Sequence, residues 1–142
     1  MDQLTQIVIK HEGMEKSAYQ DSLGYWTIGV GRLIDSRKNA GLSNDEMLYL
    51  LKNDLNQCEL ELAHFPWFMA LDTVRQDVLV ELCFNIGLHG VLEFEQMIKA
   101  LTAKDYDTAS HCLLNSLWAK QVKAGRADNM ALRLKDGFYA AY

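Results

Sequence analysis

The first 33 residues change from a helical to a strand-like pattern of apolar positions. Apolar residues recur at helical spacing up to the twelfth residue, with Asp2 placed to cap the first turn and Gly13 placed to end the helix. Residues 19–33 are instead aromatic and β-branched and are interrupted by glycines. The pattern predicts a helix over 2–12 and then a small β-hairpin or three-stranded sheet.

A long helix is predicted next. After a polar loop, Ser43 and Glu46 have the spacing of a capping box, in which each residue satisfies a free backbone N–H of the other. Apolar residues then recur at helical spacing from Met47 to Leu62. These signals predict a helix over about 44–63.

The remainder of the chain also has helical periodicity. Pro66 marks a break after the long helix. One apolar stripe then ends at Gly87, and a second covers residues 91–101. Asp105 is placed to cap a further helix, and the last helix is expected to end near Gly137.

The predicted fold class is therefore α+β and mostly α. We expect residues 1–142 to form a single domain with a small lobe over about 13–43 and a connecting helix over about 44–63. The helical lobe would comprise about 64–142 together with helix 2–12. A cleft between two unequal lobes is a natural place for a ligand.

Composition excludes several classes of protein. The chain has 49% hydrophobic and 23% charged residues, which is an ordinary globular balance, and its formal net charge is -5. A nucleic-acid binder normally needs a basic face, so we expect no nucleic-acid partner. No apolar run approaches the roughly 20 residues of a membrane span, and residues 1–20 are too polar for a signal peptide. We therefore expect a chain that is not inserted in a membrane and stays in the cytoplasm where it is made.

Cysteine and histidine residues give no sign of a metal or a cofactor. The three cysteines, Cys58, Cys83 and Cys112, are far apart and lie on apolar helical patterns, so they are expected to be reduced and packed in the core. The four histidines lack the spacing of metal ligands. No metal site and no cofactor are predicted.

Two carboxylates near the N-terminus are candidates for chemistry. Glu12 continues the apolar stripe of the first helix, where partial desolvation would favour the protonated form that a general acid requires. Asp21 enters the turn "DSLGY", in which an aspartate accepts backbone hydrogen bonds and Gly24 supplies a positive φ. Each also has an ordinary structural interpretation, as a helix-terminal and as a turn residue.

The strand after this turn is expected to have one buried and one open face. The residues expected to face the core are Trp26, Ile28 and Val30, and those on the other face are Tyr25, Thr27, Gly29 and Gly31. A three-residue loop would place Asp21 on the face of Thr27, and a two-residue loop would reverse this. Two carboxyls in different environments are what glycoside hydrolysis needs, but spacing alone leaves catalytic and structural interpretations evenly matched.

The same stretch resembles a known family. "HEG", "YQD" and "GYWTIGVGRL" are similar to the phage-type lysozymes, or endolysins, whose pattern is approximately E-G, then Y-x-D, then G-x-x-T-I-G-x-G. Weaker similarity extends through "VLVELCFNIGLHGVLEF" and "LLNSLWAKQVKAGRA". The resemblance implies a lysozyme-like two-lobe fold and a muramidase that cuts the β-1,4 bond between N-acetylmuramic acid and N-acetylglucosamine with inversion.

The resemblance also assigns roles to residues. It places Glu12 as the general acid, Asp21 as the carboxylate that positions and activates water, and Thr27 as the hydroxyl that helps to hold this water. It places Leu33, Phe84 and Asn85 at substrate-binding positions. Trp118 and Arg126 fall on motif positions near the cleft, although an aromatic residue at helical spacing is more often part of a core.

The resemblance also implies a biological role for the chain, and Arg32 departs from the family's pattern. The resemblance implies peptidoglycan strands as the partner, cooperation with a holin in host lysis, a monomer, and residence in the host cytoplasm until lysis and then in the periplasm and cell wall. Arg32 replaces a family histidine whose acidic partner aligns with Asp54, which suggests an Arg32–Asp54 ion pair.

Two other functions stay open on the sequence. One is a catalytically inactive, lysozyme-like module that binds glycan, and the other is a glycosidase that acts on chitin or chitosan. Retention of both carboxylates and the threonine favours an active enzyme over the first.

Overall fold

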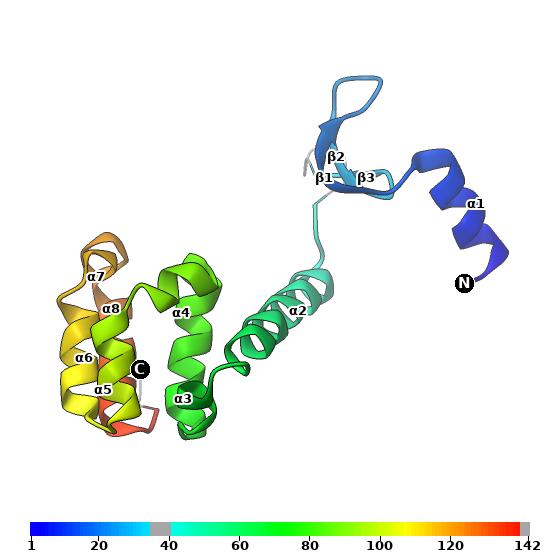
Figure 1. Cartoon of the computed structure of the whole chain (residues 1–142). Helices are drawn as coiled ribbons and strands as arrows, with labels where there is room; N and C mark the ends of the chain where they lie inside the picture. The colour runs from blue at the N-terminus through cyan, green and yellow to red at the C-terminus, as the bar shows by residue number, and fades with distance from the viewer. Residues whose placement is uncertain (35–40, 140–142) are drawn as a thin grey trace. The chain divides into compact units, whose positions relative to one another are not determined.

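The structure, a computed structural model, describes residues 1–34 and 41–139. The chain divides into two compact units, Met1–Leu50 and Leu51–Tyr142 (Figure 1). It is mostly helical with one small antiparallel sheet, which confirms the predicted α+β class. The assignment of residues 1–142 to one domain stays a prediction.

The first unit begins with the predicted helix. Helix α1 (Gln3–Glu12) has Asp2 as its N-cap, and the side chain of Asp2 accepts a hydrogen bond from the Thr5 amide at 2.8 Å. The helix ends at Gly13, whose φ is 81°. Both expected boundary signals are therefore confirmed.

A three-stranded antiparallel sheet follows α1. Its strands are β1 (Glu15–Gln20), β2 (Trp26–Gly29) and β3 (Arg32–Leu33), and β2 is the central strand. The first strand begins four residues before the segment predicted to be extended. The sheet itself was one of the two predicted alternatives.

The turn between β1 and β2 is the three-residue loop. The Asp21 amide donates to the Tyr25 carbonyl at 2.8 Å, so these two residues face each other across a loop of residues 22–24. Gly24 has a φ of 82°, a conformation that glycine adopts without strain. The loop length places Asp21 on the same face of the sheet as Thr27, as the three-residue alternative required.

The predicted core face of β2 is wrong. Trp26, expected to be buried, is 54% exposed, whereas Thr27 is only 2% exposed. Thr27 pairs with Tyr19 on one side and with Leu33 on the other, and residues directly opposite each other in a sheet have side chains on one face. These two larger neighbours flank the threonine on its face of the sheet, while Trp26 pairs with the polar Gln20.

Helix α2 (Asn44–Leu62) confirms the long helix predicted over about 44–63. Its capping box is complete: the Ser43 amide donates to Glu46 Oε2 at 2.9 Å, and the Glu46 amide donates to Ser43 Oγ at 3.2 Å. The boundary between the two units falls inside this helix.

The second unit is helical. Its further helices are α3 (Pro66–Met69), α4 (Thr73–Leu92), α5 (Glu95–Thr102), α6 (Tyr106–Leu114), α7 (Leu117–Gln121) and α8 (Ala124–Asp136). Their apolar faces surround one core, whose largest fully buried side chains include Phe68, Leu79, Leu82, Met97, Leu113, Met130 and Leu134. This core gives the second unit most of its stability because burial of apolar surface is the main favourable term in folding.

The predicted boundaries in this unit are mostly confirmed. Pro66 begins α3, Asp105 caps α6 through the Thr108 amide at 3.2 Å, and Gly137 ends α8 with a φ of 76°. Gly87 has non-helical angles (φ 79°, ψ 164°), so a kink inside α4 separates two helical stretches at the residue where the first apolar stripe was expected to end. The stripe over residues 91–101 is consequently divided between the end of α4 and α5.

The three cysteines are free thiols, of which Cys83 is in the core and Cys58 and Cys112 pack against it. This is the packing that their apolar pattern predicts. Within residues 1–34 and 41–139, no helix has the length and apolar character needed to cross a membrane.

Candidate active site

Glu12 is the last residue of α1, and its carboxyl group lies beside the turn between β2 and β3. An ideal Cβ atom on Gly31 would lie 2.5 Å from Glu12 Oε2, so the carboxyl fills the space that a side chain would need. No residue of α1 is buried, and Glu12 is exposed in its own unit. The apolar stripe predicted that the Glu12 carboxyl would be shielded from water, but residues of this unit do not shield it.

Asp21 is held by the backbone of the loop that it begins. Its Oδ1 atom accepts hydrogen bonds from the amides of Leu23 and Tyr25, both at 2.9 Å. Within the part of the chain that the structure describes, no protein group donates to the second oxygen, Oδ2. The carboxylate thus has one fixed oxygen and one that is open to a water molecule.

Tyr25 connects Asp21 to Thr27 through its backbone. Its amide donates to Asp21, and its carbonyl accepts the Thr27 hydroxyl at 3.0 Å. The carboxylate and the hydroxyl are therefore fixed by the two ends of one residue. No sequence signal points to this link, because every residue except proline supplies the same backbone groups.

Four of the expected site residues lie in the first unit. Leu33 is directly opposite Thr27 in the sheet, Asp21 is at the end of the same hairpin, and Glu12 lies against the adjacent turn. The structure thus brings these four residues to one small sheet and the helix that precedes it.

Phe84 and Asn85 lie on α4 in the second unit, where Phe84 is 45% exposed and Asn85 is exposed. The indole N–H of Trp118 donates to Asn85 Oδ1 at 2.7 Å. Trp118 itself is 7% exposed and belongs to the core, as helical spacing predicted. Beside Trp118 there is a hollow of about 460 Å³ that is lined by Ile86 and Phe94 among others.

Comparison with known proteins gives the family. The sequence pattern of phage lysozyme matches residues 9–133. The chain belongs to the phage lysozyme family. This confirms the family suggested by the motifs and makes the chain a glycoside hydrolase of the lysozyme type.

Individual relatives of this chain agree with the family assignment. An endolysin of Salmonella phage P22 is 31% identical over 80% of this chain and 79% of its own length. A probable T4-type lysozyme of Dictyostelium discoideum is 24% identical over 92% of both chains. The pre-baseplate central spike protein Gp5 of phage T4 is 26% identical over 98% of this chain, which spans only 28% of that larger protein.

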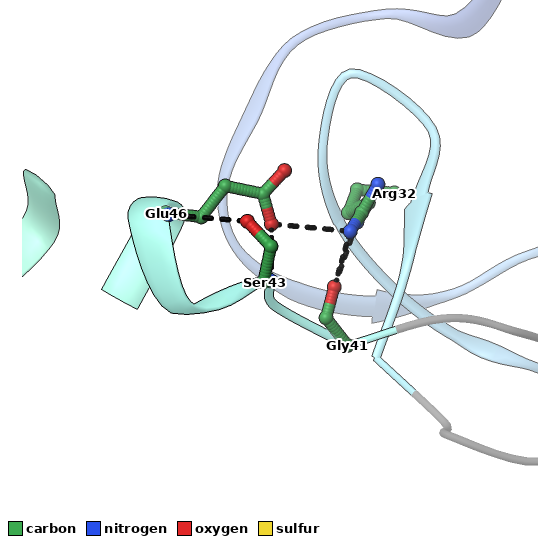
Figure 2. Close-up of polar contacts among 4 residues, drawn as sticks. All are labelled: Arg32, Gly41, Ser43 and Glu46. Carbon is green, nitrogen blue, oxygen red and sulfur yellow. Dashed lines mark hydrogen bonds and ion pairs between the residues drawn. The ribbon is translucent and has the colours of Figure 1, made fainter. Parts of the chain in front are cut away.

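Arg32, which was expected to replace a family histidine, binds residues that follow it in the first unit (Figure 2). Its Nε and Nη2 atoms donate to the Gly41 carbonyl at 2.9 and 2.5 Å, and Nη2 lies 3.2 Å from Glu46 Oε2. The same carboxylate oxygen accepts the Ser43 amide. Asp54 belongs to the second unit, so the Arg32–Asp54 ion pair stays a prediction.

Arg126 takes part in an ion-pair network of the second unit. Its Nε atom lies 3.4 Å from Glu81 Oε1, and the guanidinium of Arg133 pairs with the other oxygen of Glu81. Arg133 is 4% exposed and also donates to Asn129 at 3.0 Å. The sequence analysis missed Glu81, which lies on α4 among apolar residues and pairs with the buried Arg133 while remaining partly exposed itself.

Histidine, cysteine and acidic side chains do not gather into a metal site anywhere in the described ranges 1–34 and 41–139.

Proposed function

We propose that this chain is a peptidoglycan hydrolase, an endolysin, that cleaves the β-1,4 bond between N-acetylmuramic acid and N-acetylglucosamine. Membership of the phage lysozyme family and the similarity to phage endolysins support this substrate. In this proposal Glu12 is the general acid and Asp21 is the general base. Glu12 protonates the glycosidic oxygen while the bond to the anomeric carbon breaks.

The observation that carries the proposal is the way in which the Asp21 carboxylate is held. Two backbone amides donate to Oδ1, which keeps the group in one orientation. Its Oδ2 atom can then accept a proton from a water molecule that attacks the anomeric carbon. A turn residue held in this way serves as a base without giving up its structural hydrogen bonds.

Thr27 would determine how this water is oriented. Its hydroxyl proton is engaged by the Tyr25 carbonyl, so toward a water molecule its oxygen acts as an acceptor. A water that donates one hydrogen to Asp21 and the other to Thr27 directs a lone pair away from both. This arrangement suits attack on a sugar carbon, and attack from the face opposite to the leaving group inverts the configuration.

Inversion makes a geometric demand on the complex. It needs the two carboxyl groups to be about 6.5–9.5 Å apart, which leaves room for the water. Glu12 and Asp21 come from different elements, the end of α1 and the β1–β2 loop, which allows such a separation.

Leu33, Phe84 and Asn85 are proposed to bind the substrate. Leu33 offers an apolar contact beside Thr27, and the half-exposed ring of Phe84 offers a face for a sugar. The amide of Asn85 can donate to a carbonyl group, since its oxygen is engaged by Trp118. Acetamido groups and wall peptides supply such carbonyls.

The proposed biological role is host cell lysis. In this role a monomeric enzyme waits in the host cytoplasm until a holin opens the inner membrane, and it then acts on the cell wall from the periplasm. The names of the related endolysins are the support for it.

Substitution of the acid tests the mechanism. Glu12→Gln should reduce the release of reducing ends from purified peptidoglycan by at least 10²-fold, about the contribution of a general acid, with an unchanged circular dichroism spectrum. Glu15→Gln, an exposed acidic position on β1, is the matched control and should keep full turnover. Full activity of Glu12→Gln would overturn the assignment.

Two further measurements separate the alternatives. NMR of the first product, recorded before mutarotation, should show the α anomer, and a β product would exclude inversion. Pull-down on insoluble peptidoglycan without any release of reducing ends would instead identify an inactive glycan-binding module, and faster cleavage of chitin oligomers than of peptidoglycan would identify a chitinase-like enzyme.

A further inference from the structure

Gly31 is in direct contact with the carboxyl group of Glu12. A Cβ atom on Gly31 would lie 2.5 Å from Glu12 Oε2, 2.8 Å from Cδ and 3.1 Å from Cγ. Real Cβ atoms do not approach other heavy atoms so closely, so a side chain at this position requires the Glu12 carboxyl to move. The contact joins residues that are far apart in the sequence, one at the end of α1 and one in the β2–β3 turn.

Gly29, the last residue of β2, has a similar φ but lacks this contact. Its φ is 68° and that of Gly31 is 63°, and both values lie in the left-handed region that favours glycine. A Cβ atom on Gly29 would meet no atom within 4 Å. Both glycines therefore need a positive φ, but only Gly31 lies against the Glu12 carboxyl.

The end of the β2–β3 turn is held more firmly than the carboxyl group of Glu12. Arg32 follows Gly31 directly, and its guanidinium is bound to the Gly41 carbonyl and to Glu46 (Figure 2). Glu12, by contrast, is exposed and has a flexible side chain. When a Cβ atom is added at Gly31, the Glu12 carboxyl is therefore the group that yields.

We propose that Gly31 is a positioning residue for the general acid: the absence of a side chain there determines where the Glu12 carboxyl can lie. This inference rests on the proposed role of Glu12. A displaced acid no longer reaches the glycosidic oxygen correctly, and a displacement of about 1 Å can reduce the rate by about 10²-fold. Substrate binding elsewhere in the site is unaffected, so the loss falls on kcat.

The test compares Gly31→Ala with Gly29→Ala. Both variants place a Cβ atom at a positive φ, so we expect similar decreases in Tm. Only Gly31→Ala should lower kcat on purified peptidoglycan, by at least tenfold, with KM changed by less than about twofold. Only Gly31→Ala should also shift the ¹³C resonance of the Glu12 side-chain carboxyl, observed in uniformly labelled protein and assigned with Glu12→Gln.

Either of two results would overturn the inference: an unchanged Glu12 resonance in Gly31→Ala, or equal losses of kcat in the two variants. If Gly31→Ala does not fold, Gly31→Asn takes its place, since asparagine tolerates a positive φ and still carries a Cβ atom. Should Glu12→Gln keep full turnover, the proposed function fails, but the comparison of Glu12 resonances still decides whether Gly31 places this carboxyl.

Discussion

The indole N–H of Trp118 donates to the amide oxygen of Asn85 at 2.7 Å. Trp118 is 7% exposed, whereas Asn85 is exposed on α4. The hydrogen bond satisfies a buried donor and at the same time determines which end of the Asn85 amide is engaged. The NH₂ group is the end that stays available to a ligand.

Two substitutions of Asn85 should separate its structural from its binding role. Asn85→Ala leaves the buried indole N–H without its acceptor and should lower the free energy of unfolding by about 1–3 kcal/mol. Asn85→Asp keeps an acceptor of the same shape but loses the NH₂ donor. It should keep the stability within about 1 kcal/mol and raise the KM for peptidoglycan. Urea unfolding and steady-state kinetics measure both, and an unchanged KM in Asn85→Asp would contradict the binding role.

The Glu81–Arg133 pair should be among the most sensitive polar contacts of the second unit. Glu81→Ala leaves the guanidinium of Arg133, which is 4% exposed, without its charged partner. Because Glu81 is about one third exposed and Arg133 keeps its hydrogen bond to Asn129, we expect a loss of about 1–3 kcal/mol. Arg126→Ala is the matched control, because it removes a more exposed pair with the same glutamate and should cost about 1 kcal/mol or less. Equal losses in urea unfolding would show that Arg133 does not depend on Glu81.

Local signals predicted much of the fold. The capping box of Ser43 and Glu46, the break at Pro66 and the helix end at Gly137 are all where the sequence placed them. Each of these signals acts within a few residues of the chain, since a cap or a positive φ needs only its neighbours. Fold class followed from the same signals.

Contacts between elements could not be predicted from the sequence. The face of Thr27 was misjudged because burial in this sheet depends on Tyr19 and Leu33 across the strands, and alternation along one strand does not contain that register. The sequence placed Gly31 on the open face of the strand, but only the folded chain shows that the Glu12 carboxyl lies against it. The spacing of the motifs predicted which residues are candidates for the site, but their geometry could be described only from the structure.

Arg32 should stabilise the first unit mainly through the Gly41 carbonyl. Arg32→Ala removes both donors to this carbonyl and the ion pair with Glu46, and we expect a loss of about 1 kcal/mol. Glu46→Gln keeps an oxygen for the Ser43 amide and removes only the charge of a half-exposed pair, so its loss should stay within about 0.5 kcal/mol. Urea unfolding at low and at high salt compares them. A larger loss in Glu46→Gln would assign the stability to the ion pair instead.

Cys83 should make the stability depend on pH above neutrality. Burial in the core, together with a hydrogen bond to Cys58, raises the pKa of the Cys83 thiol from 9.0 to about 12. Below pH 9 the thiol is protonated in both the folded and the unfolded chain, so its contribution is fully present. Between pH 9 and pH 12 only the unfolded chain loses this proton, and the stability falls by up to about 1.4 kcal/mol per pH unit.

The variant Cys83→Ala isolates this effect. It lacks the thiol and creates a small cavity whose cost is independent of pH, so its deficit relative to the native protein should shrink as the pH rises. Urea unfolding of both proteins at pH 8 and pH 10.5, with a reductant present, gives the two differences in the free energy of unfolding. We expect the difference at pH 10.5 to be smaller by about 1–2 kcal/mol. Identical differences at the two pH values would mean that the Cys83 thiol titrates alike in the folded and unfolded chains.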